Sequence, residues 1–280
     1  MRVRLRSLTL LGALVLPLGC SSKAIDDQNT AAAGDSATSG GGSATSGSSA
    51  TSGGKTATGG GATSGGKTAS GGSQSVVPNA CSSALRQSLS LVDKVSTSTV
   101  SVLDETGDER TLYIDATAGG INGQDSNPWV YVSLATGQAV ALTDLDALDS
   151  TAWDLAFKRF IVRTNSGDSG PGQGGAIRIA LPWDKVDAST LGKQMLPSES
   201  WFDADCNLKV DSNMELVTTF SGWSMYNEAT HVLNAADVVF ITAGADGSLY
   251  KVGILDYYST PKGLHGTIAG NYKVRVSPLQ

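Results

Sequence analysis

Residues 238–258 read VVFITAGADGSLYKVGILDYY. Two runs rich in β-branched and aromatic residues, 238–242 and 249–258, flank a short polar segment at 245–248. Asp-Gly in that segment supplies the positive φ angles that a tight hairpin turn needs. The stretch therefore predicts an antiparallel β-hairpin, and YKVRV at 272–276 predicts another strand near the end of the chain.

Alternating apolar and polar residues recur upstream of this hairpin. No segment there keeps helical spacing over more than two turns, although Ser82 predicts the cap of one short helix over 84–91. We therefore expect residues 79–280 to form one all-β domain of antiparallel sheets joined by hairpins. The other predicted strands are 100–102, 111–114, 129–134, 157–164, 176–180 and 216–220.

The N-terminus has the features of an export signal. Three arginines in the first six residues precede an apolar run, 8–18, which is too short to span a membrane and typical of a signal peptide. The run ends in LPLGC at 16–20, which resembles the lipobox of bacterial lipoproteins. Residues 1–19 are thus a predicted lipoprotein signal peptide and Cys20 the lipidated residue. The alternative is an ordinary secretory signal in which Cys20 is incidental.

Residues 20–78 are dominated by Gly, Ser, Ala and Thr. This composition buries too little apolar surface to offset the entropy of ordering the backbone, so it predicts a disordered tether. A Gly/Ser coil of about 60 residues spans roughly 40 Å root-mean-square. We expect it to hold the domain off a bacterial outer membrane, lipid-anchored and exposed at the surface. A spacer of no selected length is the alternative.

Lipidation of Cys20 leaves Cys81 and Cys206 as an even pair in a compartment where disulfides persist. A bridge between them would clamp the N-terminal end of the domain onto the fold. Because a sequence gives no Cα separation, two separate buried thiols are the alternative.

The chain carries a net charge of -6 and has no Lys/Arg cluster beyond its first six residues, which argues against nucleic acid as a partner. GDSGP at 167–171 resembles the segment around the nucleophile of trypsin-like proteases. In that family a His precedes the Ser, whereas His231 and His265 both follow Ser169. We therefore expect no enzymatic activity.

The acidic segment 203–211 has the alternating oxygen ligands of a calcium loop. Leu208 and Met214, however, stand where an EF-hand needs Gly for its bend and Glu for its closing ligand. A solvated acidic loop is the preferred interpretation.

Several segments point to one family. WDLAFKRFIVRTNSG at 153–167 and the hairpin with Tyr-Lys at 250–251 and Tyr-Tyr at 257–258 are the most specific. WVYVSLATG at 129–137 and WSMYN at 223–227 accompany them. From about residue 95 to the C-terminus the chain resembles the HmuY family of bacterial haem-binding lipoproteins. The resemblance implies a β-rich fold, iron acquisition through haem capture, and delivery of haem to an outer-membrane transporter.

Members of this family hold haem iron with two axial side chains, a His pair in some and Met in others. Counted back from the C-terminus, the resemblance places the ligand loops near Met195 and His231, and a His/Met pair is an ordinary haem ligation. The alternatives are Met195 as a core filler and His231 as a turn residue. The family's His-Arg pair is Lys158-Arg159 here, so a donor at that position is lost.

Two tryptophans, Trp201 and Trp223, are candidates for the wall of a porphyrin pocket, since flat apolar rings suit a tetrapyrrole. Core packing is the alternative for both. Arg159 is a candidate partner for the haem propionates. A second hypothesis for the whole protein is a lipoprotein of this fold that no longer ligates haem and acts as a non-haem ligand-binding or adhesion module.

Overall fold

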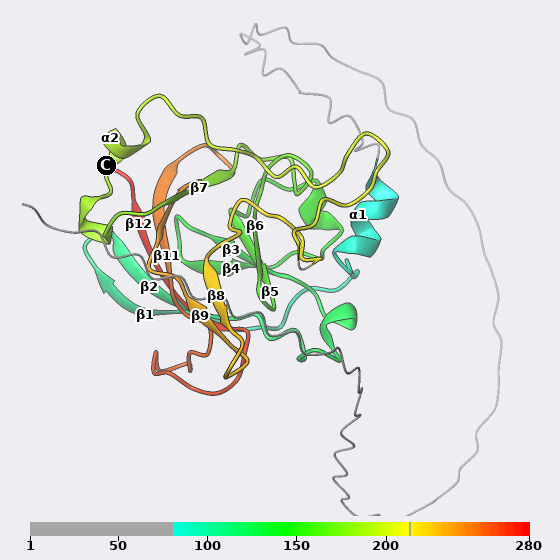
Figure 1. Ribbon diagram of the computed structural model, residues 1–280, viewed down its shortest axis with the longest axis horizontal. Helices are drawn as coiled ribbons and strands as arrows, with labels where there is room; N and C mark the ends of the chain where they lie inside the picture. The colour runs from blue at the N-terminus through cyan, green and yellow to red at the C-terminus, as the bar shows by residue number, and fades with distance from the viewer. Residues whose placement is uncertain (1–80, 213) are drawn as a thin grey trace, which may run out of the picture. The chain divides into compact units, whose positions relative to one another are not determined.

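The computed structural model describes residues 81–212 and 214–280 (Figure 1). The predicted signal peptide, Cys20 and the whole of the predicted tether lie outside these residues. In the described part, strands form three antiparallel sheets, so the predicted β-dominated fold class is confirmed. No helix in this part is both long and apolar enough to cross a bilayer.

The largest sheet has six strands, and the predicted hairpin lies inside it. Phe240 pairs with Val252, and Gly247 turns the chain at a φ of 86°. In spatial order the strands are β1 (Val100–Thr106), β2 (Glu109–Asp115), β12 (Asn271–Pro278), β11 (Leu249–Asp256), β10 (Val239–Ala243) and β7 (Gly175–Ile179).

A second sheet has four strands and a third is a two-stranded hairpin. The four are, in order, β4 (Gln138–Val140), β3 (Val130–Ser133), β5 (Leu155–Lys158) and β6 (Ile161–Thr164). The hairpin consists of β8 (Ser224–Asn227) and β9 (Val232–Ala235). The helices are α1 (Ser82–Ser88) and α2 (Ala188–Leu191), with 3₁₀ turns η1 (Gln124–Ser126), η2 (Asp146–Leu148) and η3 (Trp183–Lys185).

Two predicted strands are wrong. The segment 157–164 contains a turn between β5 and β6, in which Arg159 has a φ of 51°. The Arg159 amide donates to the Ala116 carbonyl, and its carbonyl accepts from the Tyr272 hydroxyl, each at 2.7 Å. The segment 216–220 forms no strand: Leu216 makes one isolated bridge to Val210, and Thr218 and Ser221 bond to each other across a turn.

The main core lies between the six-stranded and four-stranded sheets. Leu112 and Ile114 of β2 belong to it, as do Leu155 and Phe157 of β5. Because side chains alternate along a strand, Tyr113 and its even-spaced neighbours on β2 lie on the opposite, outer face of the large sheet.

A second core cluster forms around Trp129, Trp153 and the helix α1. A disulfide joins Cys81, just before α1, to Cys206, with the two Cα atoms 5.3 Å apart. The predicted clamp is therefore confirmed, and it closes a sequence separation of 125 residues.

Candidate functional site

The hairpin of β8 and β9 has one attached face and one open face. Tyr226 lies opposite Leu233, so the two side chains share a face. Leu233 and Ala235 pack against the main core, and the Leu233 amide donates to the Tyr258 hydroxyl at 3.1 Å. Met225 belongs to the other face and is 59% exposed. The hairpin thus presents a thioether on its open face.

Aromatic rings support the base of this hairpin. Trp223, just before β8, is buried, and its indole N–H donates to the Phe160 carbonyl at 3.0 Å. Its ring centroid lies 5.4 Å from those of Tyr257 and Tyr272. Burial raises the pKa of Tyr257 to about 12, so this phenol is protonated at neutral pH. Trp223 therefore anchors the hairpin from below.

His231 lies in the turn of the hairpin, where its backbone has a φ of 56°. It is exposed, and its Nδ1 is 2.7 Å from the Tyr226 hydroxyl oxygen. Within residues 81–212 and 214–280 no hydrogen bond engages Nε2. When Nδ1 carries the proton and donates to Tyr226, Nε2 keeps its lone pair. This is the arrangement by which histidines commonly bind iron.

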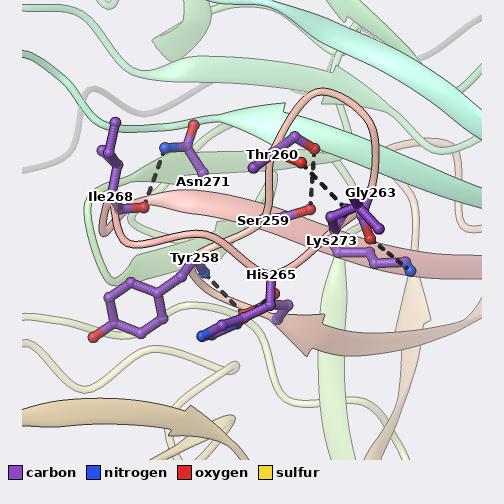
Figure 2. A network of polar contacts seen from close by, with 10 residues as sticks. Tyr258, Ser259, Thr260, Gly263, His265, Ile268, Asn271 and Lys273 are labelled. Carbon is purple, nitrogen blue, oxygen red and sulfur yellow. Dashed lines mark hydrogen bonds and ion pairs between the residues drawn. The ribbon is translucent and has the colours of Figure 1, made fainter.

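A second imidazole, His265, lies on the loop that joins β11 to β12 (Figure 2). Its Nδ1 is 3.0 and 3.1 Å from the two carboxylate oxygens of Asp256, and its ring centroid is 5.8 Å from that of Tyr258. A carboxylate at Nδ1 fixes the ring and leaves Nε2 for a metal. Sequence analysis missed this pairing because Asp256 and His265 are nine residues apart and meet only through the loop.

Met195 lies beyond α2, and its side chain is 91% exposed. The suggestion that Met195 fills the core is therefore wrong. In Figure 1 the segment after α2 runs along the top of the view, and the hairpin of β8 and β9 lies at the bottom. The structure does not bring Met195 and His231 together, and their shared ligation of one iron stays a prediction.

Trp201 is completely buried in the second core cluster, and its indole N–H donates to Glu199 at 2.9 Å. It does not line the cavity formed around Tyr113 and Asn271 or the one formed around Asp108 and Gln280. Lys158 is also buried: its Nζ donates to the Ser90 carbonyl at 3.0 Å and lies 6.0 Å from the centre of the Trp129 ring. The Lys at this position therefore belongs to the interior and not to the exposed hairpin.

Arg159 lies in the turn between β5 and β6, next to the residue that bonds Trp223. One of its guanidinium nitrogens donates to the Ala269 carbonyl at 3.2 Å. No carboxylate of the described residues forms an ion pair with it. A half-buried positive charge without an anionic partner thus lies between the base of the hairpin and the loop that carries His265.

The described residues contain no cluster of three or more His, Cys, Asp or Glu side chains that could hold a bare metal ion. Haem does not need such a cluster, because the porphyrin supplies four nitrogen ligands and the protein supplies only the axial ones. An exposed imidazole with its other nitrogen engaged, as in His231, fits this smaller requirement.

One protein family matches the chain. The family model described as HmuY protein matches residues 125–272, just over half of the chain. This range contains the hairpin of β8 and β9 and the loop that carries His265. No curated protein matches the chain.

Solved structures that are similar to the chain include the following three. A lipoprotein from Bacteroides fragilis is 17% identical, with 64% of this chain and 94% of that chain covered and a TM-score of 0.39. A HmuY-like heme binding protein from Bacteroides vulgatus is 16% identical, with 67% and 99% covered and a TM-score of 0.39. The apo HmuY analog of Tannerella forsythia is 19% identical, with 62% and 100% covered and a TM-score of 0.37.

Proposed function

The chain belongs to the HmuY family, and on that premise we propose that it captures haem as a lipid-anchored protein of the bacterial outer-membrane surface and passes it to a transporter. Cys20 would carry the lipid, and residues 20–78 would be the tether. We propose no catalytic role, since the Ser169 hydroxyl of the protease-like segment is buried and accepts a hydrogen bond from Arg163 at 2.8 Å.

The observation that carries this proposal is the pairing of His231 with Tyr226. The 2.7 Å contact engages Nδ1, and Nε2 on this exposed hairpin is then the nitrogen that would bind the iron. Imidazole is a common axial ligand of haem iron. Tyr226 adds exposed apolar surface beside it, which would cover part of a porphyrin face, whereas Met225 lies on the opposite face of the hairpin.

We assign the first axial position to His231. The second is open to Met195, as the sequence predicts, and to His265, whose ring is held by Asp256. Arg159 would pair with a propionate, because a guanidinium without a carboxylate partner is a strong donor to an anionic oxygen. Trp223 would support the base of the hairpin. Trp201, which is buried in the second core cluster, would contribute to core packing and not to haem contact.

A haemin titration of the purified full-length protein, followed by its Soret absorption, tests this function. We expect saturable one-to-one binding to the wild type and an affinity lower by at least about tenfold in His231→Ala. Thr230→Ala, in the same turn, is the matched control and should bind as the wild type does. Parallel Met195→Ala and His265→Ala variants identify the second axial donor, since only loss of a ligand changes the ferrous spectrum.

Identical spectra for His231→Ala and the wild type would refute the assignment of His231. A wild type that never saturates would refute haem capture itself. That result would favour the second hypothesis, a lipoprotein of the HmuY family that binds a non-haem ligand or acts in adhesion. Cys20→Ala should release the protein from membranes, and persistent membrane association would refute the lipid anchor.

A further inference from the structure

A polar floor lies on the outer face of the six-stranded sheet, where β2 ends and β12 begins. Tyr113 and Asp115 alternate with the core residues of β2 and so point away from the core. Asn271 pairs with Asp115 across the strands and shares its face. The Tyr113 hydroxyl donates to the Asn271 side-chain carbonyl at 2.7 Å, which fixes both groups.

The loop between β11 and β12 folds over this floor (Figure 2). Lys273 Nζ donates to the Gly263 carbonyl at 3.1 Å, and the Asn271 side-chain amide donates to the Ile268 carbonyl at 3.1 Å. The Ser259 amide donates to the Asn271 carbonyl at 2.8 Å. These bonds hold the loop as a wall above the sheet.

Floor and wall border an open cavity of about 630 Å³. Its lining is rich in hydroxyl and amide groups, includes one carboxylate and contains no Lys, Arg or His side chain. Residues that line it include Tyr113, Asp115, Thr117, Thr260, Ile268 and Asn271.

Asp115 supplies the free acceptor of this cavity. One carboxylate oxygen accepts from the Thr117 amide at 3.0 Å and from the Thr117 hydroxyl at 2.7 Å. The other carboxylate oxygen has no hydrogen-bond partner within residues 81–212 and 214–280. Beside it, a Cβ built on Gly120 would meet no atom within 4 Å, so the space at this end is open.

The cavity uses the same loop as His265, but the lining includes Gly266 and does not include His265 or Tyr258. In Figure 2 Asn271, Ile268 and Thr260 lie on the upper side of the loop, and Tyr258 and His265 lie on the lower side. The lining contains no imidazole or thioether, the donors that the proposed haem site would use. Haem capture therefore does not account for it.

We propose that this cavity binds a neutral sugar unit. Adjacent hydroxyls of a sugar ring can both donate to the free Asp115 oxygen, and the lining hydroxyls can donate or accept in return. The C–H face of the ring would pack on Ile268, whose side chain is exposed at the wall. An anionic ligand is disfavoured because Asp115 would repel it and no lining cation would compensate. The volume falls in the range of small-ligand pockets and has room for a mono- or disaccharide.

The test is a binding measurement on the purified full-length protein. Free glucose, galactose, mannose and N-acetylglucosamine are titrated by ligand-detected NMR, and immobilised neutral oligosaccharides of the same sugars are probed separately. We expect saturable binding of at least one sugar, weakened about tenfold by Asp115→Asn, since a hydrogen bond to a charged acceptor contributes about that factor. Asp104→Asn, on the exposed part of β1, is the matched control.

Ile268→Arg is a second variant. It leaves intact the hydrogen bonds that Asp115 accepts from Thr117. Only the Ile268 main-chain carbonyl takes part in the loop's hydrogen bonds, so the substitution fills the cavity mouth and leaves the wall in place. We expect it to abolish sugar binding without changing the haemin titration. Absence of binding to every sugar at millimolar concentration, or equal binding by the wild type, Asp115→Asn and Ile268→Arg, would overturn the proposal. Binding to the immobilised oligosaccharides but not to the free sugars would identify a surface glycan as the source of the sugar.

Discussion

The guanidinium of Arg163 is fully buried among aromatic rings. Its central carbon lies 4.5 Å from the ring centre of Trp129 and 5.0 Å from that of Trp153. Its nitrogens donate to the Tyr131 hydroxyl at 2.9 Å and to the Ser169 carbonyl at 3.0 Å. No carboxylate of the described residues pairs with it directly. Ring faces and a planar fork of donors thus hold this charge.

We expect Arg163→Lys to lower the free energy of unfolding by about 3 kcal/mol. A lysine ammonium is compact and cannot make all the hydrogen bonds of the planar guanidinium, so the buried charge would be poorly compensated. Arg178→Lys, at an exposed position of β7, is the control and should change stability by less than about 0.5 kcal/mol. Urea unfolding measures both. Equal losses in the two variants would contradict the role assigned to the aromatic surroundings of Arg163.

Lys158 makes stability depend on pH. Burial lowers the pKa of its ammonium below the ordinary value of 10.5, while the charges of Asp144 and Asp125 oppose the shift. Between the folded pKa and 10.5 the unfolded chain binds more protons, so this residue makes stability rise with pH in that window. The difference in unfolding free energy, wild type minus Lys158→Met, should therefore increase from neutral pH towards pH 10. A difference that stays constant or falls would contradict this sign.

Some residue roles follow from the sequence and others do not. Trp153, Leu155 and Phe157 are large apolar residues close together in the sequence, and all three are buried, Trp153 in the second core cluster and the other two in the main core. The exposure of Met195 and the pairing of His265 with Asp256 carry no local signal. They depend on loops whose path is set by contacts between distant segments.

At the scale of elements, the turn between β10 and β11 depends on one glycine. Gly247 has a φ of 86°, and a Cβ added there would meet the Gln173 side chain only at an ordinary 3.5 Å. The cost of Gly247→Ala is therefore backbone strain, and we expect a loss of about 1–2 kcal/mol in thermal or urea unfolding. An unchanged free energy of unfolding in Gly247→Ala would mean that the turn can adopt another conformation without disturbing the strand register.

Strands were predictable where alternation ended at a clear turn, as in the hairpin of β10 and β11. The error at 157–164 arose because apolar residues continue through the turn: Phe160 packs against the core from within it. The strands β8 and β9 escaped prediction because Met225 and Tyr226 are both exposed and give no two-sided pattern. The hairpin of β8 and β9, which carries His231, therefore has the weakest strand signal in the sequence.

At the scale of the whole molecule, the disulfide joins the start of the described chain to a loop 125 residues later. A cross-link that closes a loop of this length lowers the entropy of the unfolded chain, which raises the free energy of unfolding by about 4–5 kcal/mol. We expect the Cys81→Ser, Cys206→Ser double variant to lose about this much in urea unfolding under oxidising conditions. A reductant should lower the stability of the wild type and leave that of the double variant unchanged. Equal reductant sensitivity of both proteins would contradict the account.

The position of this bridge has a mechanical consequence. A pull on the chain ahead of Cys81 meets a covalent bond before it reaches α1, so the load passes directly to Cys206 and the loop around it. The first helix cannot be peeled away one turn at a time while the bond is intact. A protein held at its N-terminal side and exposed to flow or to a departing partner would keep its fold under tension that opens its reduced form.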